Sequence, residues 1–349
     1  MTNRVEKLRK KLKSGEGVLI SSKANIFYYS GFTSEDGMLY ISKEKAALLT
    51  DSRYTVQAKL EAPDFEGVIN KTKEFLKEIP ESKIYIEENY LTVQKKEMLE
   101  ANLPGKELAN SQSMISEPRK IKDEIEIGKI KAAEELGCLA FSHILGFLKP
   151  GVKEKDIALE LEFFMRKNGA SALSFDTICA SGVRSSMPHG TASDKEIKSG
   201  ELVTLDFGCI LDGYCSDMTR TVVVGKPSDD KQIEIYNTVL NAQKAALDIL
   251  KAGLPCAEAD KAARDLIKNA GYGDCFGHSL GHSLGIEIHE SPNLSEKSKD
   301  ILKPGNVVTV EPGIYIEGFG GVRIEDVAVI TENGYINLTT SEKELIILR

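Results

Sequence analysis

Two aspartates flank a strong turn signal in the middle of the chain. Asp212 and Gly213 join two runs rich in apolar and β-branched residues, with Asp206 in the first run and Asp217 in the second, which is the pattern of a β-hairpin. If Asp212 and Gly213 are the two turn residues, Asp206 pairs with Thr219, which shares a face with Asp217. A slip of two residues would place the aspartates directly opposite each other, and a slip of one would put them on opposite faces. The first two registers bring the two carboxylates within roughly 5–8 Å, whereas the simpler alternative has one aspartate facing solvent and the other capping a turn.

A second group of polar side chains lies nearer the C-terminus. Three of the five histidines fall within twelve residues, and two glutamates follow in strand-like runs; these residues are His278, His282, His289, Glu311 and Glu325. If the two aspartates and the two glutamates converge, each pair of bare carboxylates about 4 Å apart repels by about 4 kcal/mol at an effective dielectric constant near 20. Such carboxylates are either protonated or separated by cations. Four carboxylates and one imidazole suit two divalent metal ions, Mn²⁺ or Co²⁺, with Zn²⁺ as a further option.

The elements that must position these side chains are predicted from apolar periodicity. In the last two thirds of the chain the strands form long connected runs and the helices are set apart from them, which indicates an α+β fold rather than a doubly wound sheet. The expected helices are Glu124–Phe147, Lys153–Lys167, Lys231–Ala252 and Ala257–Ala270, and the expected strands are Phe175–Ala180, Leu202–Ile210, Tyr214–Val224, Val307–Val310 and Val327–Thr331.

The first third of the chain predicts a separate small α/β domain over residues 1–115. Its expected strands are Gly17–Ile20, Met38–Ser42, Ala46–Thr50 and Ile84–Glu88, and its expected helices are Thr72–Glu78 and Thr92–Glu100. The polar, proline-containing stretch Ser111–Asp123 marks the boundary, so that the second domain is expected over residues 124–349.

The composition restricts the classes of function. The chain has 349 residues, with 45 Lys and Arg against 53 Asp and Glu and a net charge of −8, so it is a poor candidate for binding nucleic acid. No apolar run is long enough to cross a bilayer, and the charged N-terminus lacks the apolar stretch of a signal peptide. The six cysteines form no CxxC pair. We therefore expect a cytoplasmic protein with free, mostly buried thiols and no membrane or nucleic-acid partner.

The ordered set of motifs resembles the pita-bread metallopeptidases, specifically their Xaa-Pro branch of prolidase and aminopeptidase P. The matching segments are DFGCILDGYCSDMTRT, GHSLGIEIHE, VEPGIY, GVRIED, PHG and the linker EPRKIKDEIE. In the first third, ANIFYYSGF and LLTDSRY resemble the creatinase/prolidase N-terminal domain. The resemblance covers nearly the whole chain, and it implies an α/β N-terminal domain followed by a pita-bread catalytic domain.

The resemblance also implies a set of ligands for two divalent metals. By their positions in these motifs, the resemblance implies that Asp206 is the bidentate ligand of one metal and that His282 and Glu311 are ligands of the other. Asp217 and Glu325 match the bridging carboxylates. Glu311 is also the candidate that takes a proton from water and passes it to the leaving nitrogen.

Four further residues match the family's substrate site. By resemblance, His189 and His289 line this site and take part in catalysis, with His289 contacting the peptide near the scissile carbonyl. His278 and Arg323 match groups that orient the substrate. Ser283 departs from the family, which often has glycine at this position.

The implied function is hydrolysis of the Xaa-Pro peptide bond at a free N-terminus. An Xaa-Pro dipeptidase is favoured because the chain is short, and an aminopeptidase P that acts on longer peptides is the alternative. The expected substrates are peptides with proline in second position. The resemblance further suggests a homodimer in which the N-terminal domain helps to close the partner's site.

Other functions fit the residues less well. The pattern GHSLG occurs twice, so a serine hydrolase using Ser279 or Ser283 was weighed, but no histidine follows His289 and the required order of serine, acid and histidine is not met. A metal-free binding module and a creatinase-like hydrolase are disfavoured because all five potential ligands are retained. A methionine aminopeptidase is disfavoured as well, because its function does not require the N-terminal domain.

Overall fold

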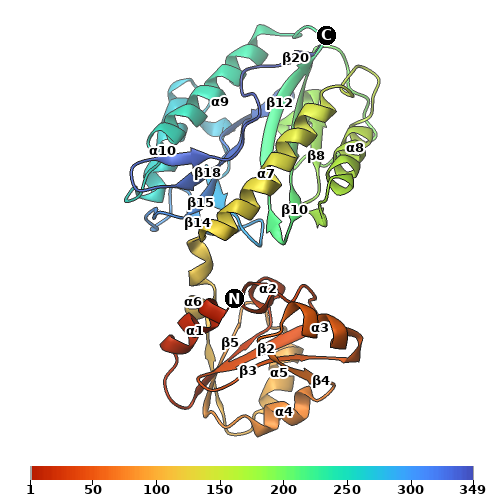
Figure 1. Ribbon diagram of the computed structural model, residues 1–349. Coiled ribbons are helices and arrows are strands. Elements are labelled where there is room, and N and C mark those ends of the chain that lie inside the picture. Colours follow the sequence, from red (N-terminus) through yellow and green to blue (C-terminus); the bar gives the residue numbers. More distant parts are fainter. Residues whose placement is uncertain (1, 349) are drawn as a thin grey trace. The chain divides into compact units, whose positions relative to one another are not determined.

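The computed structural model describes residues 2–348 and consists of two compact units, Met1–Arg119 and Lys120–Arg349 (Figure 1). The division lies inside the polar stretch Ser111–Asp123. The outermost ends of the expected domains, Met1 and Arg349, lie outside the described residues.

The first unit is built on a six-stranded sheet of order β4-β3-β2-β1-β5-β6. β1 pairs antiparallel with β2 and parallel with β5, so the sheet is mixed. The strands are β1 (Glu16–Ile20), β2 (Gly37–Ser42), β3 (Ala46–Thr50), β4 (Glu66–Ile69), β5 (Lys83–Ile86) and β6 (Glu107–Asn110). The helices are α1 (Thr2–Lys11), α2 (Lys23–Ser30), α3 (Thr55–Glu61), α4 (Thr72–Glu78), α5 (Val93–Asn102) and α6 (Gln112–Ile115). All six elements expected in this third of the chain are present, whereas β4, β6 and the helices α1, α2, α3 and α6 were not predicted.

The second unit packs four long helices against mainly antiparallel sheets, in which β12 and β20 form a parallel pair. The helices are α7 (Glu124–Ile144), α8 (Glu154–Lys167), α9 (Asp230–Asp248) and α10 (Cys256–Asn269). The strands are β7 (Ala172–Leu173), β8 (Ile178–Ser181), β9 (Glu201–Phe207), β10 (Cys209–Leu211), β11 (Tyr214–Cys215), β12 (Met218–Val224), β13 (Gly281–Ser283), β14 (Glu290–Leu294), β15 (Val307–Val310), β16 (Gly313–Ile316), β17 (Gly320–Arg323), β18 (Asp326–Ile330), β19 (Tyr335–Asn337) and β20 (Ile347–Leu348). All four predicted helices are present, with ends shifted by a few residues.

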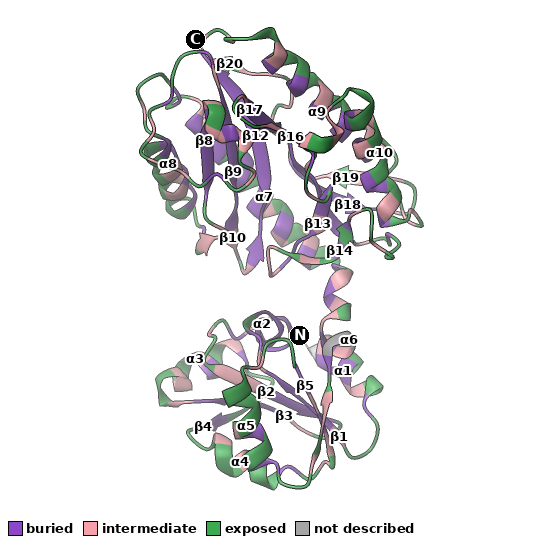
Figure 2. Ribbon diagram, turned by 180° about the vertical axis from the view of Figure 1, so that it is seen from behind, coloured by how far each residue is buried: buried purple, intermediate pink, exposed green. Residues whose placement is uncertain are grey.

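Two large sheets carry or adjoin several of the candidate site residues, whereas Arg323 lies on β17 of a two-stranded sheet. The two large sheets have the orders β20-β12-β9-β8 and β14-β13-β15-β18-β19. Their strands β8, β9, β12, β15 and β18 are almost wholly buried (Figure 2), whereas β14, β19 and β20 are partly exposed. One core cluster contains residues of α7 and α8 with β9 and β12, and a second contains residues of α9 and α10 with β15 and β18. Among residues 2–348, no helix combines the length and the apolar character needed to span a membrane.

The hairpin that carries the two aspartates adopts the first of the predicted registers. Thr219 pairs with Asp206, and the turn is closed by two residues with positive φ, Asp212 at 48° and Gly213 at 80°. Such a turn matches the right-handed twist of the flanking strands. Because side chains alternate along a strand, the register places Asp206 and Thr219 on one face.

Three predicted strands are wrong in part. Leu202–Ile210 is divided at Gly208 between β9 and β10, and Tyr214–Val224 is divided at Ser216 and Asp217 between β11 and β12. Within the expected strand Phe175–Ala180 only the last three residues are extended in a ladder, because β7 ends at Leu173 in a three-stranded sheet and β8 begins at Ile178 in a different sheet. The segment between them crosses from one sheet to the other and cannot continue either ladder. Glu311 directly follows β15 and Glu325 directly precedes β18, so neither glutamate lies within a strand.

Candidate active site

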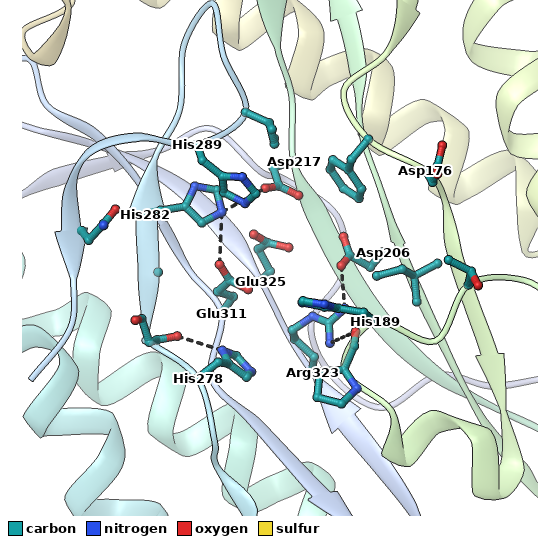
Figure 3. Close-up of a pocket in the computed structure, with 18 residues that line it drawn as sticks. Asp176, His189, Asp206, Asp217, His278, His282, His289, Glu311, Arg323 and Glu325 are labelled. Atoms are coloured by element: carbon teal, nitrogen blue, oxygen red, sulfur yellow. Dashed lines mark hydrogen bonds and ion pairs between the residues drawn. The ribbon is translucent and has the colours of Figure 1, made fainter. Parts of the chain in front are cut away.

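A cavity of 510 Å³ in the second unit contains the candidate chemistry. All nine predicted site residues line it: His189, Asp206, Asp217, His278, His282, His289, Glu311, Arg323 and Glu325. Figure 3 shows the labelled side chains arriving from several strands and loops and facing the same space. Residues separated by more than a hundred positions therefore share one site.

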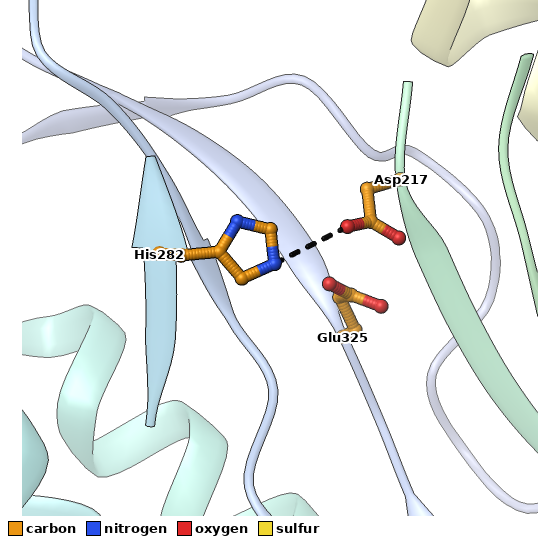
Figure 4. A group of neighbouring side chains, drawn as sticks. All are labelled: Asp217, His282 and Glu325. Atoms are coloured by element: carbon orange, nitrogen blue, oxygen red, sulfur yellow. Dashed lines mark ion pairs between the residues drawn. The ribbon is translucent and has the colours of Figure 1, made fainter. Parts of the chain in front are cut away.

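Three of the expected metal ligands form a tight group. Suitable ligand atoms of Asp217, His282 and Glu325 all lie within 4.8 Å of one another (Figure 4). His282 Nε2 lies 3.5 Å from Asp217 Oδ2. Asp217 precedes β12, His282 lies on β13, and Glu325 connects β17 to β18, so the group joins the two large sheets at their strand ends.

Glu311 lies beside this group. Its Oε1 is 3.4 Å from His282 Nε2 and accepts a hydrogen bond from Thr309 Oγ1 at 3.0 Å. A matching threonine serves Glu325, because Thr219 Oγ1 donates to Glu325 Oε2 at 2.7 Å. Each of these glutamates thus has one carboxylate oxygen fixed by a neighbouring hydroxyl.

Asp206 faces the same cavity but takes a different partner. Arg323 Nη2 donates to Asp206 Oδ2 at 2.5 Å. The same guanidinium donates to Thr219 Oγ1, to Tyr315 Oη and to the carbonyl of Pro188. In this arrangement Arg323 supplies positive charge to Asp206, one of the two expected ligands that lie outside the three-residue group.

Burial sets the electrostatics of the site. Loss of hydration and the neighbouring carboxylates raise the pKa values of Asp217 and Glu325 well above normal. Burial also raises the pKa of Glu311 to about 8, although the charge of Arg323 opposes this shift. Carboxylates gathered in this way favour protonation unless a cation offsets their repulsion.

The residues present fit divalent cations. Asp206 Oδ1 and Glu325 Oε1 are buried and have no hydrogen-bond partner in the described part of the chain, which is costly for a carboxylate oxygen unless it has a ligand. Burial and the nearby His289 lower the pKa of His282 to about 4, so its imidazole is neutral at pH 7. Its Nδ1 lies 3.2 Å from the carbonyl of Ser283, and this leaves Nε2 directed at the carboxylates, as in a metal-ligating histidine.

The remaining histidines occupy the walls of the cavity. The His289 and His282 rings lie 4.5 Å apart between centroids, at an angle of 71°. His278 Nε2 lies 2.9 Å from Tyr315 Oη, and burial together with the charge of Arg323 lowers the pKa of His278 to about 4. His189 lines the cavity next to Pro188.

Two residues that support the site were not predicted. Tyr315 joins His278 to Arg323 through its hydroxyl, and the only available signal was its place in the motif VEPGIY. Glu134 of α7 is fully buried and accepts a hydrogen bond from the backbone N–H of Asp217 at 2.7 Å. Burial raises its pKa to about 8. A glutamate on the apolar face of a predicted helix was a possible signal for this second case.

The arrangement gives no support to a serine nucleophile. The Ser283 hydroxyl accepts a hydrogen bond from Lys122 Nζ at 2.9 Å. Within residues 2–348, neither this hydroxyl nor that of Ser279 is hydrogen-bonded to a histidine ring. The hydrogen-bonded serine–histidine pair that activates a serine nucleophile is therefore not found.

Comparison with known proteins identifies both parts of the chain. Residues 128–332 match the model of metallopeptidase family M24, and residues 4–121 match that of the creatinase/prolidase N-terminal domain. The Xaa-Pro dipeptidase of Pyrococcus horikoshii is 41% identical over 332 residues, covering 95% of this chain and 94% of the relative.

Solved structures agree with this result. A structure of the Xaa-Pro dipeptidase from Bacillus anthracis has a TM-score of 0.95 and 44% identity, covering 99% of both chains. The X-Pro aminopeptidase from Thermotoga maritima has a TM-score of 0.92 and 39% identity, also covering 99% of both. The expected α+β fold, a creatinase/prolidase N-terminal domain with a pita-bread catalytic domain, is confirmed. The chain therefore belongs to metallopeptidase family M24, and membership of this family implies divalent metal ions.

Proposed function

We propose that this chain is an Xaa-Pro dipeptidase, which hydrolyses the bond before proline in dipeptides with a free N-terminus. The observation that carries the proposal is the convergence of four buried carboxylates and one neutral imidazole on a single cavity. Three relatives that are 40–44% identical over nearly the whole chain are named Xaa-Pro dipeptidases, which supports the same substrate class.

The proposed metal ligands are Asp206, Asp217, His282, Glu311 and Glu325. Asp217 and Glu325 are the proposed bridges between two ions, because their oxygens lie in the tightest group. Oxygen-rich ligation suits Mn²⁺ or Co²⁺, and Zn²⁺ is compatible with it. When bound, the ions supply Lewis acidity, which makes hydroxide available near neutral pH and polarises the scissile carbonyl.

Glu311 is the proposed proton carrier of the reaction. Its carboxylate faces the cavity, and a carboxylate placed beside the reacting water can act as a general acid–base group. It would accept a proton from the attacking water and deliver it to the prolyl nitrogen of the leaving group. Proline has no amide hydrogen, so a site for Xaa-Pro bonds needs no acceptor for that group.

The histidines and Arg323 are the proposed substrate groups. His189 and His289 face the cavity from different loops and can contact the peptide on either side of the scissile bond. His278 and Arg323 are held by the Tyr315 hydroxyl, which fixes the orientation of both side chains. We infer that these four residues orient the substrate.

A comparison of two peptides tests the proposal. After chelation, the protein is supplied with Mn²⁺, Co²⁺ or Zn²⁺ and assayed on Ala-Pro and Ala-Pro-Ala-Ala. We expect cleavage of Ala-Pro by the reloaded protein and none by the chelated protein. Faster cleavage of the tetrapeptide would favour the alternative, aminopeptidase P, to which the similarity to the Thermotoga maritima structure also points. Failure to cleave either peptide with any metal would reject both.

Two further features are proposed with this function. We propose a homodimer in which each N-terminal domain helps to close the partner's site; sedimentation equilibrium should give twice the chain mass of 38.3 kDa. We also propose a cytoplasmic location. All six cysteines are free and five of them are buried, which suits a reducing compartment, and cell fractionation tests this location.

A further inference from the structure

The side chain of Lys122 contacts residues on both sides of the histidine-bearing loop. Its ammonium is almost fully buried, with 1% of the side chain exposed. Nζ donates to Ser283 Oγ at 2.9 Å and to Glu290 Oε2 at 3.1 Å. Ser283 follows His282 on β13, and Glu290 follows His289 at the start of β14. One ammonium therefore joins the two ends of the loop.

The carboxylate of Glu290 shapes the same loop from within. Its Oε1 accepts hydrogen bonds from the backbone N–H groups of Ile286 at 3.1 Å and Glu287 at 3.2 Å. Gly285 packs so closely that a Cβ atom there would lie 2.9 Å from Glu290 Oε1. The loop wraps around this carboxylate, and its next two residues, Ile288 and His289, line the cavity.

The backbone of Lys122 is itself fixed to the other side of the site. Its N–H donates to the carbonyl of Gly305 at 2.8 Å. Gly305 lies in the turn before β15, the strand that Glu311 directly follows. Lys122 thus connects the histidine loop to the strand that positions Glu311.

Ser283 was noted above as a departure from the family, which often has glycine there. Its side chain is fully buried and its hydroxyl accepts from Lys122. The departure therefore adds a contact to Lys122 without changing a proposed ligand.

We propose that Lys122 is a positioning residue of the active site, which acts through Glu290 to hold the loop of residues 284–289 in the shape that presents His289 to the cavity. The inference rests on the proposed function, because His289 is a substrate contact there. A buried pair of charges adds little net stability compared with apolar residues of the same size, but removing one partner leaves an uncompensated charge. Such a pair is suited to fixing one conformation of the loop.

The test compares Lys122→Met with Lys120→Met in the full-length, metal-loaded protein. Lys120 lies two residues away on the same segment and pairs with Asp300 at 3.6 Å, so it is a matched control. In Lys122→Met we expect amide hydrogen exchange at Ile286 and Glu287 to accelerate at least about tenfold. We expect kcat/KM for Ala-Pro to fall by roughly 10- to 100-fold, the usual effect of losing a group that orients a ligand. Lys120→Met should leave both quantities unchanged.

A double variant separates positioning from general stability. Lys122→Met/Glu290→Gln removes both charges of this ion pair, and the amide oxygen of Gln can still accept from both loop N–H groups. It should therefore recover much of the loop protection and of kcat/KM lost in Lys122→Met. It also keeps the test valid if Lys122→Met alone does not fold, since kcat/KM and loop exchange of the double variant are then compared with those of Glu290→Gln, and the two should agree within about threefold.

Three results would overturn the inference. One is a Lys122→Met protein with normal loop exchange and normal kcat/KM. Another is faster exchange with unchanged kcat/KM, because Lys122 would then be only structural. The last is an equal loss of activity on replacing Lys122 in the wild-type and Glu290→Gln backgrounds. Accelerated exchange in a protein whose wild type does not cleave Ala-Pro would instead reject the proposed function and leave the positioning of the loop standing.

Discussion

Glu311 combines three properties that a proton carrier needs at the residue scale. It faces the cavity, it lies 3.4 Å from His282, and its hydrogen bond from Thr309 fixes one oxygen. Burial raises its pKa to about 8. These properties depend on the carboxylate rather than on the size of the side chain.

Replacing Glu311 by glutamine should remove proton transfer and keep the fold. We expect kcat for Ala-Pro to fall by roughly 10²- to 10⁴-fold, the usual contribution of a general acid–base group. Steady-state kinetics and circular dichroism measure the two effects. Glu317→Gln, in the exposed turn between β16 and β17, is the control and should retain full activity. A Glu311→Gln enzyme within tenfold of wild type would contradict the role.

The raised pKa values predict how the stability of the metal-free protein depends on pH. Burial raises the pKa values of Glu311 and Glu134 to about 8, above the ordinary value of 4.5 for a glutamate side chain. Between these values the native state binds more protons than the unfolded state, so these groups make the free energy of unfolding fall as pH rises. Below pH 6.5 the lowered pKa values of His278 and His282 act in the opposite direction. Between pH 6.5 and 8 the raised pKa values of these glutamates act without this opposition, so the predicted fall in the free energy of unfolding is clearest there.

Urea denaturation of chelated protein at several pH values tests this dependence. Between pH 6.5 and 8 we expect the free energy of unfolding to decrease, by up to about 1.4 kcal/mol per pH unit for each such group. Added divalent metal should weaken or reverse the trend, because ligands bind metal in their deprotonated form. A metal-free protein whose free energy of unfolding rises between pH 6.5 and 8 would contradict the raised pKa values of Glu311 and Glu134.

Among the secondary-structure elements, β13 and β15 position two of the proposed metal ligands. Gly281 begins β13 and packs against the backbone of β15, since a Cβ atom at Gly281 would lie 2.1 Å from the carbonyl oxygen of Thr309. The neighbouring His282 and Glu311 are both proposed ligands. The close approach of the two strands is therefore what brings these ligands together.

Gly281→Ala should push β13 away from β15 and disrupt both ligands. We expect a loss of about 1–3 kcal/mol in the free energy of unfolding, as for other overpacked sites, together with weaker metal binding measured by calorimetry. The first copy of the repeated GHSL sequence supplies the control. Gly277 has no atoms within 4 Å of an added Cβ, so Gly277→Ala should bind metal normally. Equal losses of stability and metal binding in Gly281→Ala and Gly277→Ala would show that the contact between β13 and β15 is not what positions the ligands.

Two units with separate hydrophobic cores make up the whole molecule. In the first, β1, β3 and β5 pack with α4 and α5 into one buried cluster. In the second, the clusters around α7 and α9 enclose the sheets that carry the site. We propose domains over residues 1–115 and 124–349, connected by the intervening polar segment.

A fragment of residues 1–119 tests the independence of the first unit. Because its sheet and core are complete within these residues, we expect a single cooperative thermal transition by circular dichroism. The fragment should not bind Mn²⁺ or Co²⁺ in calorimetry, since all proposed ligands lie in the second unit. A fragment without a cooperative transition would show that the core depends on the rest of the chain.

The sequence by itself determined the features that depend on neighbouring residues. The Asp212-Gly213 turn set the register of the aspartate hairpin, because positive φ at both positions and the two-residue period of a strand leave few alternatives. Apolar periodicity predicted the long helices, because the repeat of a helix is set by residues only three or four positions apart. The types of the proposed ligands, four carboxylates and one imidazole, also followed from residue types and order.

Only the tertiary structure decided which distant groups meet. Arg323 pairs with Asp206, which is 117 positions away, and Lys122 reaches Glu290 across 168 positions. Tyr315 and Glu134 joined the site for the same reason. Such contacts arise from the packing of two sheets and their covering helices, and local conformational preferences carry no information about which strand ends lie together. The pKa shifts likewise depend on burial and on the surrounding charges, which exist only once the chain is folded.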